Sequence, residues 1–310
     1  MVLRVAPGTV AAMPEEITRV GDVELAYETF GDPAHPAMLL VMGLATQMLG
    51  WRAGFCAALA QRGFHVIRFD NRDVGRSTRF SSHPPPTRSQ LLRRDASAAA
   101  YSLADMADDG VGLLDVLGIE RAHVVGASMG GMIAQTIAFR HPERVLSLVS
   151  IMSNTGARWS GQPALSTYSV LLKRAPRDRE GFVAHQMDVF ARIGSPGFAR
   201  DEDDQREMAG ASFDRGHDPA SAGRQLAAII ASGDRTDDLA RIDVPTLVIH
   251  GTKDKLVAPS GGRATAKAIP GARLLTIEGM GHDLPRGAWP QIVEAIAENA
   301  AAAGAPAAAA

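Results

Sequence analysis

The nine residues from His123 to Gly131 constrain this sequence more than any other segment. The apolar run that ends at Gly126 is typical of a buried strand, and beyond Ser128 apolar residues recur at helical spacing. Residues 126–130 therefore match the G-x-S-x-G pattern in the strand–turn–helix context that this pattern requires. Glycines at both ends let strand and helix approach closely around a strained serine backbone. The segment predicts an exposed serine hydroxyl at a strand end, placed for nucleophilic attack.

Strands and helices alternate along most of the chain. The predicted strands are 17–20, 23–29, 37–42, 64–69, 123–127, 145–151, 246–250 and 273–277, and the predicted helices are 48–61, 102–117, 129–141, 261–269 and 289–299. Gly21 and Asp22 between the first two strands predict a tight hairpin. The later strands are separated by helices, which implies parallel strands joined by crossovers. The fold class is therefore α/β, with a mostly parallel central sheet and helices on both faces.

One long segment interrupts this alternation. Residues 154–235 contain no good strand, and helices are predicted over 165–173, 183–193, 205–213 and 221–231. We therefore expect a core formed by residues 1–153 and 236–310, with residues 154–235 as a helical cap. Residues 1–16 and the alanine-rich residues 300–310 are predicted to lack regular structure.

Composition excludes several classes of function. The 310 residues include 32 basic and 34 acidic side chains, and no charged block favours a nucleic-acid partner. The single cysteine, Cys56, excludes an intrachain disulfide framework and a cysteine-rich metal site. No apolar run reaches the roughly 18–20 residues of a membrane span, and no secretory signal is recognisable. We expect a cytoplasmic enzyme without a membrane partner, and assembly into a homo-oligomer remains open.

A serine nucleophile needs a base, and the base needs an orienting acid. Of nine histidines, His282 stands apart because it lies in a Gly-flanked loop directly after the last predicted strand. His250 lies inside a strand and is better explained as structure. Asp254 follows the preceding strand and is the predicted acid. Asp283 is the alternative by adjacency, although neighbouring side chains diverge.

Two backbone N–H groups should stabilise the oxyanion that forms when a serine attacks a carbonyl. The residue after the nucleophile, Met129, is one predicted donor. Leu44, in the loop after Met42-Gly43, is the other. Residues 70–73, Asp-Asn-Arg-Asp, follow another strand and are interpreted as a polar cluster that orders its loop.

From about residue 17 to residue 299 the sequence resembles the α/β-hydrolase superfamily. Within it, segments 40–44 (LVMGL), 70–77 (DNRDVGRS), 245–249 (PTLVI) and 279–282 (GMGH) resemble the aclacinomycin methylesterase type. The resemblance implies an α/β-hydrolase fold and a carboxylic ester hydrolase. It implies Ser128, Asp254 and His282 as catalytic triad, in the chain order of this superfamily, with Leu44 and Met129 as oxyanion donors. Many relatives carry His-Gly where this chain has Met42-Gly43, so this chain lacks a histidine that orders the loop in those relatives.

The expected substrate is a small apolar ester, cleaved through an acyl-enzyme. No cofactor is expected, because the sequence contains neither an H-E-x-x-H metal motif nor a G-x-x-x-x-G-K-[ST] nucleotide motif. Two alternatives stay open, since the same triad serves carbon–carbon bond hydrolases and a fold does not fix a function. The second alternative is a non-catalytic member that binds a ligand. Dehalogenases and epoxide hydrolases of this superfamily use an aspartate where this chain has Ser128.

Overall fold

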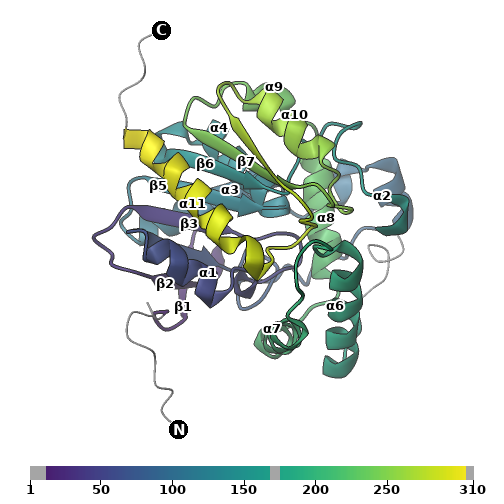
Figure 1. The fold of residues 1–310 in the computed structure, drawn as a ribbon. Coiled ribbons are helices and arrows are strands. Elements are labelled where there is room, and N and C mark those ends of the chain that lie inside the picture. Colours follow the sequence, from purple (N-terminus) through teal and green to yellow (C-terminus); the bar gives the residue numbers. More distant parts are fainter. Residues whose placement is uncertain (1–11, 168–174, 305–310) are drawn as a thin grey trace.

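The computed structural model describes residues 12–167 and 175–304, with an eight-stranded sheet at its centre (Figure 1). The strands are β1 (Glu16–Val20), β2 (Val23–Phe30), β3 (Ala37–Val41), β4 (His65–Phe69), β5 (Ala122–Ala127), β6 (Val145–Ile151), β7 (Thr246–Gly251) and β8 (Arg273–Ile277). They lie in the order β1-β2-β4-β3-β5-β6-β7-β8. The β1–β2 and β2–β4 pairs are antiparallel, and the other five pairs are parallel. The predicted mostly parallel α/β sheet is confirmed.

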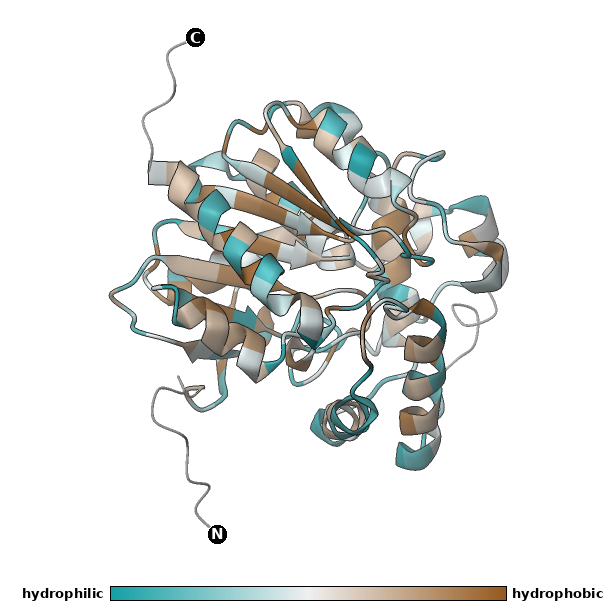
Figure 2. Ribbon diagram, viewed as in Figure 1, coloured by the Kyte–Doolittle hydropathy of each residue, from teal (hydrophilic) through white to brown (hydrophobic). Residues whose placement is uncertain are grey.

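Helices cover both faces of this sheet. They are α1 (Ala53–Ala60), α2 (Arg88–Arg93), α3 (Leu103–Val116), α4 (Met129–Arg140), α6 (Arg179–Ile193), α7 (Glu202–Arg215), α8 (Ser221–Ser232), α9 (Thr236–Leu239), α10 (Ser260–Ala268) and α11 (Trp289–Ala301). α1 and α11 pack against one face, and α3 and α4 against the other. In Figure 2 the central strands are mostly brown or pale, whereas α11 alternates brown and teal. A strand buried on both faces is apolar at most of its positions, but a helix on the surface of the sheet is apolar on one side only.

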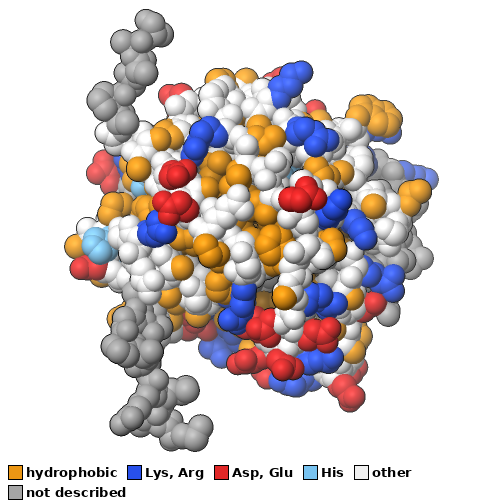
Figure 3. All heavy atoms as spheres, viewed as in Figure 1, with side chains coloured by type: hydrophobic (Ala, Val, Ile, Leu, Met, Phe, Trp, Pro, Cys, Tyr) orange, Lys and Arg blue, Asp and Glu red, His pale blue; other side chains and the backbone are white. Residues whose placement is uncertain are grey.

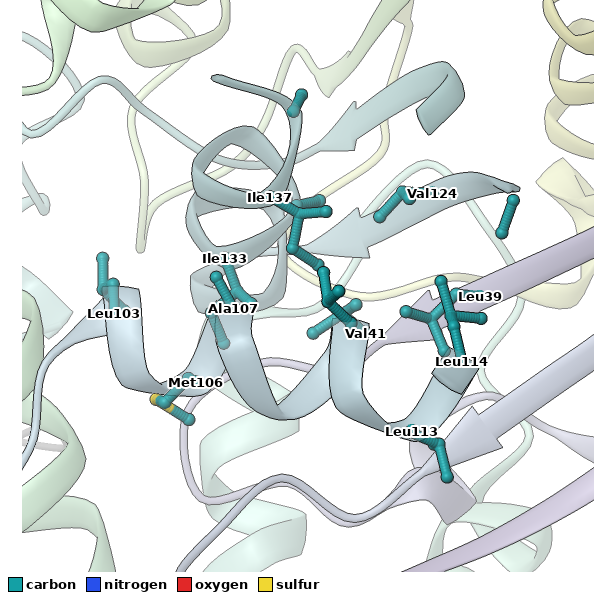
Figure 4. Packing of buried hydrophobic residues seen from close by; sticks show 14 of the residues in the cluster. Leu39, Val41, Leu103, Met106, Ala107, Leu113, Leu114, Val124, Ile133 and Ile137 are labelled. Atoms are coloured by element: carbon teal, nitrogen blue, oxygen red, sulfur yellow. The ribbon is translucent and has the colours of Figure 1, made fainter. Parts of the chain in front are cut away.

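The two faces of the sheet bury separate apolar clusters. On the α3–α4 face, Leu114 lies beside Leu39 of β3, and Ile133 and Ile137 of α4 face the strands (Figure 4). All four side chains are fully buried. Burying one such side chain contributes roughly 1.5–3 kcal/mol, so these clusters dominate the stability of the core. The sheet is therefore a rigid platform for the loops that follow its strands.

Between β6 and β7 the chain forms helices α6 to α9 and no strand in its described part. Figure 1 shows α6 and α7 side by side, outside the layer of the sheet. Both helices begin earlier than predicted, because Asp178 and Asp201 accept hydrogen bonds from the first turns and cap them. Residues 168–173 of the predicted helix 165–173 lie outside the described part of the chain. The remaining residues, 165–167, form a 3-10 turn.

Other predicted boundaries need correction. The predicted helix 48–61 is broken into a 3-10 turn, Met48–Gly50, and α1, because the backbone at Arg52 is extended and Trp51 is fully buried. Residues 300–304, predicted to be irregular, continue α11 to Ala301 and add a 3-10 turn, as the high helix propensity of alanine allows. Helix α2, with a Thr87–Gln90 capping box, is absent from the prediction. Strand β1 begins at Glu16, inside the segment predicted to be loose.

Buried ion pairs join the inserted helices to the core. Arg224 of α8 forms a bidentate ion pair with the fully buried Asp73. Arg215 at the end of α7 reaches the equally buried Asp70 at 2.9 Å. Figure 3 shows acidic and basic side chains gathered over α7 at the lower edge of the molecule. No helix in the described ranges is long and apolar enough to cross a membrane.

Candidate active site

Ser128 occupies a strained turn between β5 and α4. Its φ is 56° and its ψ is −120°, a backbone conformation that residues other than glycine rarely adopt. A Cβ on Gly126 would lie 2.0 Å from the Gly130 carbonyl oxygen, and one on Gly130 would lie 2.1 Å from the Val41 oxygen. Only glycine fits at both positions, as the sequence pattern requires. Ser128 is thereby left half-buried at the end of β5.

The three predicted side chains meet in one hydrogen-bonded chain. His282 Nε2 lies 2.9 Å from Ser128 Oγ, and His282 Nδ1 lies 2.7 Å from Asp254 Oδ2. The three residues follow β5, β7 and β8, whose carboxyl ends lie at the same edge of the sheet. This geometry can pass a proton from the serine to the imidazole while the carboxylate fixes the ring tautomer.

The surroundings of Asp254 favour its ionised form. Its Oδ1 accepts the backbone N–H groups of Leu256 and Val257, both at 2.9 Å. Burial by itself raises the pKa of Asp254, but the His282 imidazolium and hydrogen bonds from His250, His282 and Val257 hold it well below its usual range. A carboxylate that stays charged stabilises the imidazolium formed when the serine loses its proton.

The alternative acid, Asp283, faces a different partner. Its Oδ1 accepts the hydroxyl of Ser195, which follows α6, and Ser195 Oγ in turn accepts the Gly281 N–H at 2.8 Å. The His282 N–H donates to the Ile193 carbonyl at 2.7 Å. Burial raises the pKa of Asp283, which the hydrogen bond from Ser195 only partly offsets. The histidine loop is thus fixed to the end of α6.

The two predicted oxyanion donors flank the serine. A Cβ on Gly43 would lie 3.1 Å from Ser128 Cβ, so the loop after β3 runs directly against the nucleophile. Met129 is the first residue of α4, where the backbone N–H has no partner within the helix. Leu44 N–H likewise donates to no backbone group in the described ranges. Two donors next to one hydroxyl form an arrangement suited to a tetrahedral oxyanion.

The polar cluster at residues 70–73 orders the neighbouring loops, as the sequence predicts. Asn71 Nδ2 donates to the Met42 carbonyl at 2.8 Å, and Asp70 Oδ1 accepts the Met48 N–H at 2.7 Å. Asp73 accepts the Tyr101 hydroxyl at 2.8 Å. Asn71 thus anchors the loop beside Ser128 at Met42.

A cavity of about 50 Å³ lies between the inserted helices and the loops at residues 45–47 and 73–79. Its lining from the inserted segment mixes apolar and polar side chains: Phe182, Gln186, Phe190, Met208, His217 and Asp218. Neither Ser128 nor His282 lines it, so this cavity is separate from the hydrogen-bonded pair that they form. The volume suits a few water molecules and is well below that of a ligand pocket. In the described part of the chain, no three or more His, Cys, Asp or Glu side chains are grouped to hold a metal.

Three residues that contact this site were given no role in it by the sequence. His250, interpreted as purely structural, lies in β7 with its Nε2 2.9 Å from the Val257 carbonyl and 3.5 Å from Asp254 Oδ2. Ser195 and Gln225 come from the inserted helices and contact the histidine loop and the loop after β3. The four-residue spacing from His250 to Asp254 could have indicated the first. No local pattern indicates the other two, because their partners lie far away in sequence.

Comparisons with known proteins identify the family of this chain. Residues 36–285 match the alpha/beta hydrolase fold family. The chain is 30% identical to rhodomycin D methylesterase DauP of Streptomyces sp. (strain C5), over 94% of this chain and 99% of that protein.

Solved structures extend the comparison. The enol-lactonase from Burkholderia xenovorans LB400 is 25% identical, with a TM-score of 0.72 over 92% of this chain and 99% of that one. The 2-hydroxy-6-oxo-6-phenylhexa-2,4-dienoate hydrolase from Rhodococcus sp. strain RHA1, at 22% identity, shares the fold with a TM-score of 0.72 over 94% and 99% of the two chains. The family match covers most of the sequence, and the site combines a serine at a strained strand–helix turn with a hydrogen-bonded histidine and carboxylate. We conclude that the chain is a hydrolase that belongs to the α/β-hydrolase family.

Proposed function

We propose that this protein is a carboxylic ester hydrolase in which Ser128, His282 and Asp254 act as a catalytic triad. The observation that carries the proposal is the continuous hydrogen-bonded chain from Asp254 through His282 to Ser128, with distances of 2.7 and 2.9 Å. The similarity to a methylesterase supports an ester as the substrate class. Small esters with an apolar body are the proposed substrates, and residues 154–235 are the proposed cap that selects them.

The reaction follows from the positions of these groups. Ser128 Oγ attacks the ester carbonyl carbon as its proton moves to His282 Nε2, and the negative charge on the carbonyl oxygen is stabilised by the Leu44 and Met129 N–H groups. Collapse of the tetrahedral species breaks the C–O bond, and the imidazolium protonates the departing alcohol. Water, deprotonated by the same imidazole, then attacks the acyl-enzyme and releases the acid and free Ser128.

The experiment is hydrolysis of a graded panel of aryl and methyl esters by the wild type and by Ser128→Ala. Ser128→Ala should fold normally and lose nearly all activity, because a triad without its nucleophile retains only a residual over the water reaction. Ser97→Ala, at an exposed serine, is the matched control and should be fully active. A Ser128→Ala enzyme that keeps a tenth of the wild-type kcat would refute the assignment.

Two further arms of the panel separate the remaining alternatives. A β-diketone or ring-cleavage substrate tests carbon–carbon hydrolysis, and faster turnover of that substrate than of any ester would reassign the reaction. A chelator should leave ester hydrolysis unchanged, because each step uses a protein group or water. Loss of activity in chelator, restored by a divalent metal, would contradict this mechanism.

A further inference from the structure

The loop after β3 is held at several successive peptide groups. The Met42 carbonyl accepts Asn71 Nδ2 at 2.8 Å, which fixes the peptide before Gly43. The Leu44 carbonyl accepts the Thr46 hydroxyl at 3.1 Å. The peptide between Gly43 and Leu44, which carries the Leu44 N–H, therefore lies between two fixed neighbours. Its own carbonyl accepts the Thr46 N–H at 3.2 Å.

The inserted segment supplies one of these restraints. Ala45 has a φ of 54°, a left-handed conformation that costs a non-glycine residue of order 1–2 kcal/mol. Its N–H donates to Gln225 Oε1 of α8 at 2.7 Å, across 180 positions of sequence. Gln225 is fully buried, so this hydrogen bond is shielded from water. The bond therefore holds Ala45 in a conformation that the loop would otherwise leave.

The second contact of Gln225 fixes the orientation of its amide. Gln225 Nε2 donates to the Arg72 carbonyl at 3.0 Å. Since a backbone N–H needs an acceptor and a carbonyl needs a donor, the two partners together determine which amide atom is oxygen. Gln225 thus bridges the loop after β3, which runs directly against Ser128, and the loop after β4.

We propose that Gln225 is a positioning residue for the oxyanion donor Leu44. By holding the Leu44–Ala45 peptide, it sets the direction of the Leu44 N–H one peptide earlier. This inference rests on the proposed ester hydrolysis and deepens it, because it makes the inserted helices part of the catalytic geometry. Gln225 acts through Ala45 and touches no reacting atom.

The test compares two substitutions with a matched control. Gln225→Met keeps the length of the side chain and removes both hydrogen bonds, whereas Gln225→Glu keeps an oxygen that can accept the Ala45 N–H. Gln135→Met is the control: Gln135 is also fully buried on a helix, and it bonds Ser150 of β6 at 3.0 Å, away from the loop after β3. Thermal unfolding of all variants separates loss of stability from loss of catalysis.

Each variant is assayed with an aryl ester and titrated with an aryl trifluoromethyl ketone, which adds to the serine and forms an oxyanion. The matching methyl ketone, which stays uncharged, is the ground-state probe. Gln225→Met should lower kcat about 10- to 100-fold, less than the 10²–10³-fold cost of deleting a whole donor. KM should change less than threefold. Affinity for the trifluoromethyl ketone should fall in parallel with kcat, while affinity for the methyl ketone stays unchanged.

Gln225→Glu should recover most of the kcat. Gln135→Met should lose stability without a selective loss of kcat and of affinity for the trifluoromethyl ketone. An unchanged kcat in Gln225→Met, or equal losses of affinity for both ketones, would overturn the positioning role while leaving ester hydrolysis intact. A wild-type protein that hydrolyses no ester and binds no trifluoromethyl ketone would instead overturn the proposed function, and the inference with it.

Discussion

Replacing Asp254 by asparagine should inactivate the enzyme, because it changes which ring nitrogen of His282 carries the proton. Oδ1 of Asp254 accepts two backbone N–H groups at 2.9 Å. In Asp254→Asn the amide oxygen must keep that position, because an NH₂ group there would face two other donors. The NH₂ group then faces His282 Nδ1, which can only accept its hydrogen. The ring proton moves to Nε2, and Nε2 can no longer take the proton of Ser128.

The size of the loss follows from the role of that proton. An asparagine that leaves the geometry intact but imposes the wrong tautomer lowers kcat about 10⁴-fold in triad enzymes, which is about 5.5 kcal/mol of transition-state stabilisation. We expect a loss of this order for Asp254→Asn. KM should change little, because the carboxylate lies behind the imidazole and away from the substrate.

Asp283→Asn is the matched comparison, since it makes the same chemical change at the adjacent carboxylate. Asp283 Oδ1 accepts the Ser195 hydroxyl, and an amide oxygen can accept it as well. The change weakens a charge-assisted hydrogen bond to a neutral one, a difference of about 1 kcal/mol. If all of it disturbed the His282 loop, kcat would fall about fivefold.

The assay is the kcat of both variants on one chromogenic aryl ester, with circular dichroism to confirm folding. The ratio between the two losses is the decisive quantity, and we expect it to exceed about 10³, which follows from the two effects above. A larger loss in Asp283→Asn than in Asp254→Asn would refute the tautomer argument and transfer the orienting role to Asp283.

Burial lowers the pKa of His123 to about 4. The unfolded chain therefore binds more protons than the folded protein as the pH falls from 6.5, and stability should drop by about 2 kcal/mol between pH 7 and pH 5. Urea titrations should show this drop, and His123→Gln should flatten it; an unchanged slope would exclude His123 as its source. Arg224→Met leaves the Asp73 carboxylate buried and unpaired, so it should cost about 3–5 kcal/mol of unfolding free energy. Arg192→Met, at an exposed ion pair, should cost less than about 0.5 kcal/mol. Equal costs would contradict a stabilising role of the buried Arg224–Asp73 pair. Gly130→Ala places a Cβ 2.1 Å from a carbonyl oxygen of β3, so it should lower both Tm and kcat, and a fully active variant would show that the turn tolerates bulk.

Features governed by local chemistry could be predicted from the sequence. Alternating apolar runs and turns predict the parallel sheet, and its topology brings the carboxyl ends of β5, β7 and β8 to one edge. Ser128, Asp254 and His282 could be selected for that reason, since each follows one of these strands. The glycines around Ser128 could be recognised because only they permit the close approach of strand and helix at this turn.

Tertiary structure alone decided how these groups are held. The sequence left Asp283 as an alternative acid, and the structure pairs it with Ser195 because the end of α6 folds against the histidine loop. Gln225 meets Ala45 across 180 residues, and no periodicity or composition encodes such a contact. Chain segments that lie far apart in sequence come together only when the whole sheet and its insertion have formed. The candidate catalytic residues were therefore visible in the sequence, while the residues that hold them in place depend on packing between distant elements.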